Sequence, residues 1–150
     1  MANVVYDYFK KALMVGSINL NGAGFLGGTA DAVYCALVSN SYSPNPATDV
    51  YLSNLTNVVT PSNYVAYFAL SSPGVYYDTS LHQGILTGSN LLLATITLGT
   101  TVRGMVLFTT SPLGNGSAPL IAYLDFVTDQ AVTAGTLQIN FSASGILALT

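Results

Sequence analysis

The chain contains few side chains that could carry out nucleophilic or acid–base chemistry. His82 is its only histidine, and Cys35 is its only cysteine. A catalytic triad would have to combine His82 with Asp78, four residues earlier, and with either Cys35 or a distant serine. A histidine in a loop and a buried, unreactive cysteine are simpler interpretations. We therefore expect no catalytic residue, and we expect that the protein is not an enzyme.

Asp125 and Asp129 are the only closely spaced carboxylates late in the chain. Two carboxylates could flank the bond that a glycosidase cleaves, or could bind a hard cation such as calcium. Two carboxylates alone are too few ligands for calcium, and no set of residues offers the ligands of a zinc site. We interpret the pair as the end of a strand and its turn, and we expect neither a metal nor a cofactor.

Three further features could indicate binding. The glycine-rich stretch at 21–28 lacks the Lys-Ser or Lys-Thr that follows a phosphate-binding loop, so we interpret it as a flexible turn. Lys10 and Lys11 are too few for a basic membrane-binding face, which favours a solvated helix. The ten tyrosines could stack on sugars or bases, but dispersed tyrosines are more typical of core edges and subunit contacts.

The composition is apolar and almost uncharged. Hydrophobic residues make up 51% of the 150 residues, charged residues make up 6%, and the formal net charge is -3. Without a basic cluster the chain lacks the electrostatic features of nucleic-acid binding, so we expect no nucleic-acid partner. No apolar run reaches the roughly 18 to 20 residues of a membrane helix, and we expect no membrane association and no signal peptide. So few charges predict that copies of the chain or another protein cover part of its surface.

The elements predicted from periodicity are mostly strands. Asn3 can cap an amphipathic helix over residues 3–15 that ends at Gly16, and Asn45 with Pro46 can start a second, short helix that reaches about Leu55. Residues 64–70 fit either a strand or a helix. The predicted strands cover 18–20, 32–39, 75–77, 91–98, 103–108, 120–126, 136–141 and 145–150.

Alternation within two of these strands predicts which side chains face the core. In residues 136–141 the inward set is Leu137, Ile139 and Phe141. In residues 91–98 the inward set is Leu92, Ala94, Ile96 and Leu98. The fold class that follows is mainly β, a single domain over residues 1–150 built as an antiparallel β-sandwich or roll with an N-terminal helix and one further short helix.

Several motifs, taken in order, resemble a family of small structural proteins of tailed bacteriophages. They are YDYFKKAL at 6–13, GSINL at 16–20, VYCALV at 33–38, SYSPN at 41–45, LIAYLDF at 120–126, DQ at 129–130 and GTL at 135–137. The resemblance covers both ends of the chain, and the segment 58–88 departs from it by being richer in tyrosine and proline.

The resemblance implies a virion component, most simply a decoration (cement) protein that binds the outside of the capsid and stabilises it. Its partners would then be the major capsid protein and further copies of itself, with a trimer preferred because capsid lattices offer threefold positions. A tail or neck component, and a receptor-binding or carbohydrate-binding virion module, are the alternatives. The contact residues that we expect are the aromatic side chains of the divergent segment, namely Tyr64, Tyr67, Phe68, Tyr76 and Tyr77.

Overall fold

The computed structural model of the chain describes residues 2–20, 31–109 and 117–149. The glycine-rich stretch at 21–28, interpreted above as a turn, lies outside the described residues. The described strands are β1 (Val4–Val5), β2 (Val33–Ser39), β3 (Val58–Val59), β4 (Tyr67–Ala69), β5 (Gly74–Asp78), β6 (Gln83–Thr87), β7 (Leu91–Ile96), β8 (Val102–Thr109), β9 (Leu120–Gln130), β10 (Gly135–Ile139) and β11 (Leu147–Leu149). The described helices are α1 (Asp7–Met14) and the short 3-10 helix η1 (Leu52–Asn54). The mainly β, antiparallel fold with one α-helix near the N-terminus confirms the predicted fold class.

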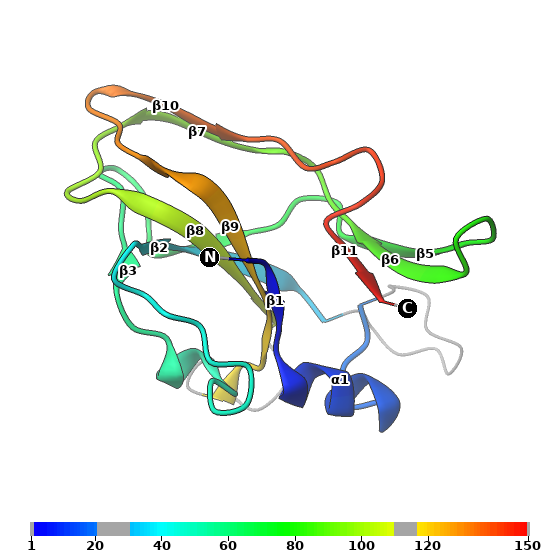
Figure 1. Cartoon of the computed structure of the whole chain (residues 1–150). Coiled ribbons are helices and arrows are strands. Elements are labelled where there is room, and N and C mark those ends of the chain that lie inside the picture. The colour runs from blue at the N-terminus through cyan, green and yellow to red at the C-terminus, as the bar shows by residue number, and fades with distance from the viewer. Residues whose placement is uncertain (1, 21–30, 110–116, 150) are drawn as a thin grey trace.

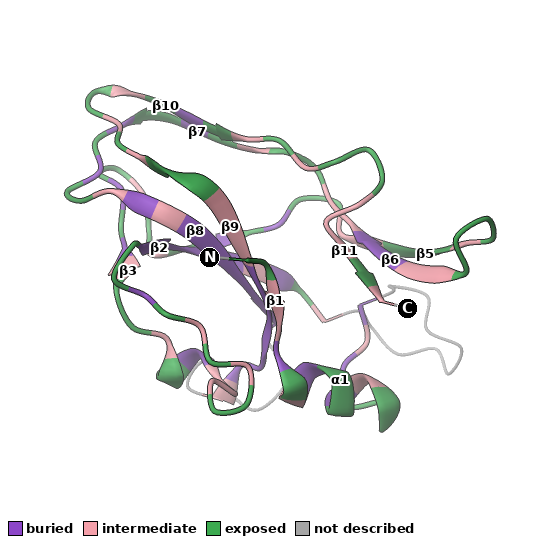
Figure 2. Cartoon of the chain, in the orientation of Figure 1, coloured by how far each residue is buried: buried purple, intermediate pink, exposed green. Residues whose placement is uncertain are grey.

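A six-stranded sheet forms the centre of the molecule (Figure 1). Its strands run in the order β1-β9-β8-β2-β3, and β4 pairs with the other half of the β2 edge. Strands β2 and β8 are apolar on both faces and buried along almost their whole length, as expected for central strands covered on both sides (Figure 2). The ambiguous segment 64–70 contributes β4, because residues 67–69 pair with β2.

Each face of this central sheet has its own core. One core joins side chains of β2, β8 and β9 to α1, to residues 18–20 and to the outer strands; it includes Phe9, Cys35, Leu37, Met105, Leu107, Leu93 and Leu137. The other core lies beneath the segment that follows β2; it includes Tyr6, Ala36, Val38, Tyr42, Leu52, Phe108 and Tyr123. The central sheet is thus a scaffold with both faces covered.

Hydrogen-bonded tyrosines fix the segment that covers the second core. The hydroxyl oxygens of Tyr6 and Tyr42 lie 2.7 Å apart, and the Tyr42 hydroxyl donates to Asp49 Oδ2 at 2.9 Å. Burial is the main reason that the pKa of both tyrosines is raised above the ordinary value. Both phenols therefore stay neutral and available as hydrogen-bond donors.

Two smaller sheets flank the central one. Strands β7 and β10 form an antiparallel ribbon, and β5, β6 and β11 form a three-stranded antiparallel sheet with β6 in the middle (Figure 1). The last four strands of the chain are therefore shared among three sheets, with β8 and β9 in the centre, β10 in the ribbon and β11 in the small sheet.

The N-terminal helix begins later than predicted. Val4 and Val5 form β1, which pairs with β9, and α1 starts only at Asp7. Asn3 is not the helix cap, because its Oδ1 accepts a hydrogen bond from the backbone N–H of Asp125 at 2.8 Å. Two consecutive β-branched residues favour an extended conformation, and the free edge of β9 provides the partner strand.

The end of the helix is as predicted. Gly16 has φ of 68°, and its N–H donates to the carbonyl of Leu13 at 3.1 Å. The N–H of Ser17 donates to the carbonyl of Ala12 at 2.9 Å. This pair of bonds is a Schellman motif, in which glycine adopts the left-handed conformation without steric cost.

The second predicted helix is much shorter than expected. Residues 45–49 form a turn in which the N–H of Asp49 donates to the carbonyl of Asn45 at 2.9 Å, and only Leu52–Asn54 become helical. The backbone of this segment pairs instead with the start of β9. The N–H of Leu52 donates to the carbonyl of Ala118, and the N–H of Leu120 donates to the carbonyl of Val50. These long-range bonds use backbone N–H and carbonyl groups that would have to bond within the segment if the helix were longer.

The predicted inward sets of the ribbon are partly wrong. Leu92 is 59% exposed, whereas its neighbour Leu93 is 1% exposed. Thr95 has φ of 55°, and the pairing with β10 shifts register beside it, so that Ile96 and Leu98 are buried as predicted. A single bulge changes which face alternate residues occupy, so the prediction is wrong for Leu92 and Ala94, before the bulge.

The alternation predicted for β10 is confirmed, but two of the three inward side chains are less buried than predicted. Leu137 is buried, whereas Ile139 and Phe141 are only half-buried. The strand pairs only with β7 among the described residues, so this two-stranded ribbon cannot enclose its apolar face as the central sheet does.

Candidate interaction surface

Cys35 is placed where it cannot act as a nucleophile. Its side chain is 0% exposed in the middle of β2, and its thiol donates to the carbonyl of Phe68 at 3.3 Å. Burial raises the pKa of the thiol to about 12, so the reactive thiolate is not populated near neutral pH. The residue is a small apolar core side chain, as interpreted from the sequence.

His82 lies at the tip of the β5–β6 hairpin, exposed and away from Cys35 in the core. Its Nδ1 lies 3.0 Å from the Tyr77 hydroxyl. The carboxylate of Asp78 accepts hydrogen bonds from the N–H groups of Ser80 and Leu81, which closes the hairpin turn. Asp78 and His82 form no hydrogen bond or ion pair with each other, so the structure does not assemble the triad considered above.

Arg103 joins the two carboxylates of β9. Its Nε donates to Asp125 Oδ1 at 2.6 Å, and its Nη1 donates to Asp129 Oδ1 at 3.3 Å. The Nδ2 of Asn40 donates to Asp129 Oδ2 at 2.8 Å. The hydrogen bond from Arg103 is the largest contribution that lowers the pKa of Asp125, to about 2. This cluster ties β8, β9 and the turn after β2 together, and both aspartates lie within β9 rather than at a turn beyond it.

No three histidine, cysteine, aspartate or glutamate side chains come close enough to hold a metal ion within the part of the chain that the structure describes. Among the same residues, no helix has the length and apolar character needed to cross a membrane.

The five predicted contact residues do not form one surface. Tyr64, Tyr67 and Phe68 lie in or beside β4 on the central sheet, whereas Tyr76 and Tyr77 lie in β5 on the small sheet. Phe68 is 7% exposed and packs in the core, so, contrary to the prediction, its side chain is not available to a partner. Among the four tyrosines, Tyr77 is 60% exposed, Tyr76 is 44% exposed and Tyr67 is 38% exposed, whereas Tyr64 is half-buried.

The other two tyrosines are partly occupied by contacts within the chain. The Tyr64 hydroxyl accepts a hydrogen bond from the N–H of Ala94 at 3.1 Å, and its ring packs edge-on against Phe68. The ring of Tyr67 packs edge-on against Phe108, with 5.4 Å between the ring centroids. Contact through Tyr64, Tyr67, Tyr76 and Tyr77 stays a prediction, and the first two offer less free surface.

The small sheet has one face that points toward α1. Cross-strand pairing places side chains in rows, and one row on this face is Val75, Leu86 and Leu147. The neighbouring row is Tyr77, Gly84 and Leu149. The middle position of this second row is a glycine, so the centre of the face carries no side chain.

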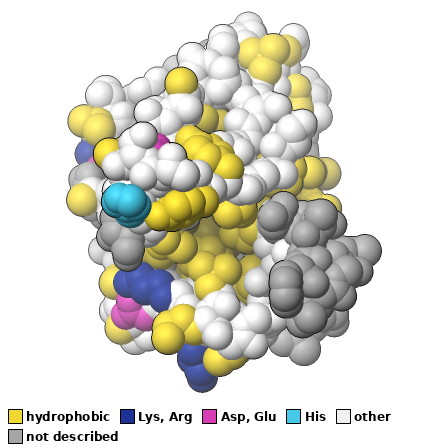
Figure 3. All heavy atoms as spheres, turned by 90° about the vertical axis from the view of Figure 1, so that its right-hand side faces the viewer, with side chains coloured by type: hydrophobic (Ala, Val, Ile, Leu, Met, Phe, Trp, Pro, Cys, Tyr) yellow, Lys and Arg dark blue, Asp and Glu magenta, His cyan; other side chains and the backbone are white. Residues whose placement is uncertain are grey.

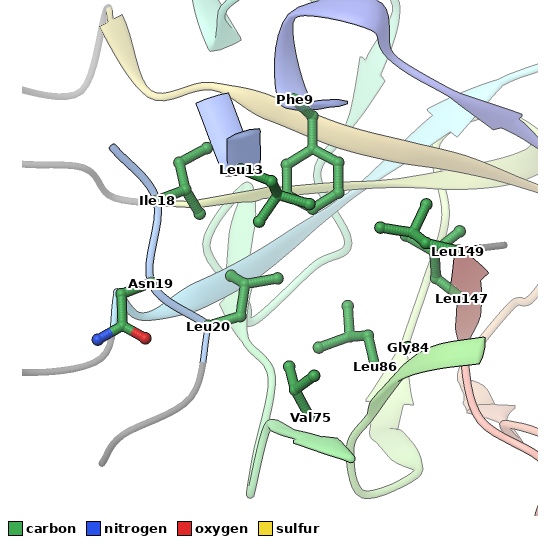
Figure 4. A pocket seen from close by; sticks show the side chains of 10 residues that line it. All are labelled: Phe9, Leu13, Ile18, Asn19, Leu20, Val75, Gly84, Leu86, Leu147 and Leu149. Carbon is green, nitrogen blue, oxygen red and sulfur yellow. The ribbon is translucent and has the colours of Figure 1, made fainter. Parts of the chain in front are cut away.

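A pocket of about 250 Å³ lies between this face and α1 (Figure 4). Its walls come from α1, from residues 18–20 and from all three strands of the small sheet; they are Phe9, Leu13, Ile18, Asn19, Leu20, Val75, Gly84, Leu86, Leu147 and Leu149. Asn19 is the only polar side chain among them, and its backbone N–H donates to Asp31 Oδ2 at 2.8 Å. The walls can therefore offer dispersion and desolvation to an apolar group but little hydrogen bonding.

Exposed apolar side chains surround this pocket. Figure 3 shows them at the floor and margins of a hollow, with the histidine on one side and lysine and aspartate side chains below. Met14 at the end of α1 is 88% exposed, and Leu81 in the hairpin is 60% exposed. A second recess, lined by Lys10, Leu13, Met14, Ala148 and Leu149, shares two walls with the pocket. We call the pocket, this recess and the exposed side chains Met14, Val75 and Tyr77 the apolar end; Tyr76 is exposed on the opposite face of the small sheet.

Most of the apolar end was not predicted from the sequence. Strand β6 was missed altogether, because QGILT is short and its glycine weakens the strand signal. A glycine inside a strand often marks a close approach by another group, and this signal could have singled out Gly84. The position of α1 opposite the sheet carries no sequence signal.

Comparison of the chain with protein-family models, with curated proteins and with solved structures finds no match in any of the three.

Proposed function

We propose that this protein is a structural component of a bacteriophage virion, a decoration protein that binds the outside of the capsid and stabilises it. The observation that supports the proposal most is the apolar end, where large exposed apolar side chains surround an apolar pocket. Monomeric proteins rarely leave such side chains contiguous and exposed, because contact with another protein removes them from water. The ordered motifs that resemble small phage structural proteins supply the class of partner.

The rest of the molecule is suited to a structural role. The central sheet is covered on both faces, and its charged side chains on β8 and β9 are engaged in the Arg103 cluster. A scaffold of this kind can present a contact surface without moving. The partners in this proposal are the major capsid protein and further copies of the chain, with a trimer at a threefold position of the lattice.

Sedimentation with capsids that lack the protein tests the proposal. We expect the purified protein to sediment with such capsids and to have a mass well above 15.6 kDa in light scattering. A Tyr77→Ser variant should bind more weakly, because a 60% exposed aromatic side chain at the apolar end is lost. Leu92→Ser, which removes a similarly exposed side chain from the β7–β10 ribbon, is the matched control and should bind like the wild type.

Protein that stays in the supernatant with capsids but is found in the tail fraction of disrupted virions would contradict the proposal. That result would move the protein to the tail or neck. A receptor-binding or carbohydrate-binding module would instead show ligand-dependent stabilisation in a glycan screen.

A further inference from the structure

Gly84 occupies a position where the fold itself does not require glycine. It lies in the middle of the central strand of the small sheet, facing the pocket. A Cβ atom built at Gly84 meets no heavy atom within 4 Å, and its φ lies outside the left-handed region. Glycine weakens a strand interior because it has no side chain to pack, so its presence here needs another explanation.

Gly104 in the central sheet shows the contrasting case. A Cβ atom there would lie 2.5 Å from the ring of Tyr123 and 2.6 Å from the carbonyl oxygen of Leu124. The close packing of that aromatic ring accounts for the glycine. At Gly84 no atom of the described residues lies within 4 Å of a built Cβ, and this space forms part of the pocket.

We propose that Gly84 keeps this pocket open for a large, uncharged apolar side chain of a partner protein, aromatic or branched aliphatic, which inserts as an anchor when the partner binds. The identity of the partner as a capsid subunit rests on the function proposed above. The absence of a side chain at residue 84 gives the pocket its depth, and the flanking rows of the small sheet and α1 form its walls.

The size and chemistry of the pocket determine this class of occupant. An engineered apolar cavity of about 150 Å³ holds a benzene molecule, and the pocket here measures about 250 Å³. One phenyl, indole or branched aliphatic group therefore fits. A charged or strongly polar group would lose its hydration without replacement, because Asn19 is the only polar side chain among the described residues of the walls.

The surroundings of the pocket favour a protein over a free small molecule. Apolar exposure continues beyond the pocket onto Tyr77 and Met14, at 60% and 88%, which a ligand filling the pocket would leave in water. A protein surface that delivers one side chain into the pocket would cover these residues at the same time. Lys10, in the neighbouring recess, pairs with Asp7 at 2.8 Å, and the carboxylate of Asp31 accepts a hydrogen bond from the N–H of Asn19 at 2.8 Å, so each of these charged groups is already engaged within the chain.

The test is a Gly84→Val variant, which places a β-branched side chain in the pocket, with Gly99→Val as the matched control. Gly99 is exposed, lies after β7, and likewise has no heavy atom within 4 Å of a built Cβ. Gly84→Ala is a milder second variant. Circular dichroism and thermal unfolding would establish that each variant is folded.

Two measurements follow. Benzene, as a probe of the pocket, should raise the unfolding temperature of the wild type and of Gly99→Val but not that of Gly84→Val. Binding to capsids that lack the protein should weaken about tenfold or more for Gly84→Val, as expected for loss of an anchor side chain, should weaken less for Gly84→Ala, and should be unchanged for Gly99→Val.

The outcomes separate this inference from the proposed function. Equal capsid binding by the wild type and Gly84→Val would overturn the anchor and leave the decoration role standing. Benzene stabilisation together with unchanged capsid binding by Gly84→Val would make the pocket a site for small molecules, which also overturns the anchor. A wild type that does not bind capsids would overturn the decoration role, and with it the partner named here.

Discussion

The central sheet and the small sheet use similar apolar residues but are covered to very different extents. Every residue of β8 except Arg103 is buried. In β5 no residue is fully buried, and three consecutive residues, Val75, Tyr76 and Tyr77, are exposed. The central strands lie between two cores, whereas the small sheet faces an apolar pocket on one side.

Under the proposed function, the central sheet stabilises the fold and the small sheet binds the partner. Burial of apolar side chains in the central sheet stabilises the fold, and the small sheet leaves part of the same kind of surface in water. Exposed apolar area contributes little to the folded monomer but becomes favourable when a partner covers it. The two regions should therefore respond differently to the same kind of substitution.

The largest contrast is expected for aromatic side chains. Phe108→Ala in β8 should lower the free energy of unfolding by about 3 to 5 kcal/mol, because the side chain is 2% exposed and packs against Tyr34 and Tyr67. Tyr77→Ala in β5 should lower it by no more than about 0.5 kcal/mol. Urea denaturation of both variants measures the difference. Similar losses would show that the small sheet is as well packed as the central one.

Alanine at Gly104 should destabilise the protein by about 1 to 3 kcal/mol, because its methyl group would collide with the Tyr123 ring and the Leu124 carbonyl. Chemical denaturation would measure the loss. A smaller change would mean that Tyr123 can move aside, and that the central sheet is less tightly packed than its burial indicates.

Acid should weaken the central sheet through Asp125. The pKa of this carboxyl is lowered from 3.8 to about 2 in the folded protein, so its stabilising contribution is present above pH 3.8 and is lost as the pH falls toward 2. The measured free energy of unfolding should decrease as the pH falls across this range. The Arg103→Met substitution should make this decrease smaller. Asp7→Asn, which breaks the exposed pair with Lys10, is the control and should leave the decrease unchanged.

The smallest effect, with the opposite sign, is expected at Gly84. Gly84→Ala should raise the free energy of unfolding by about 0.5 to 1 kcal/mol, because alanine restricts the unfolded chain and meets no obstacle in the folded one. Thermal or urea unfolding would detect the gain. A loss of stability would show that the strand cannot accept a side chain, and glycine would then be explained by the fold.

Local sequence patterns predicted the parts of the fold that depend on neighbouring residues. The continuous apolar runs at 32–39 and 103–108 correspond to the buried strands β2 and β8, and Gly16 ends the helix as predicted. The same reasoning was wrong where a distant partner competes for the backbone. Val4 and Val5 pair with β9 instead of extending the helix, and the backbone of Val50 and Leu52 bonds to Leu120 and Ala118 at the start of β9, so only Leu52–Asn54 become helical.

The sequence predicted the exposure of only some of the aromatic residues expected to make contacts. Composition predicted that a partner covers some apolar surface, which stays a prediction; Tyr76 and Tyr77 are exposed. Phe68 has the same apolar character in the sequence but is buried, because β4 pairs with β2 and places this side chain in the core. The periodicity of the sequence does not predict which aromatic side chains strand pairing will bury and which it will leave exposed.

The sequence by itself determined that this is a β-rich chain with an N-terminal helix and very few charges, because these properties depend on residue type and on spacing over a few positions. Only the tertiary structure decided where the apolar surface lies. The pocket brings together α1 near the N-terminus, β6 in the middle of the chain and β11 near its end. Long-range strand pairing and the packing of the helix create that juxtaposition, and the free space above Gly84 exists only because the assembled elements do not fill it.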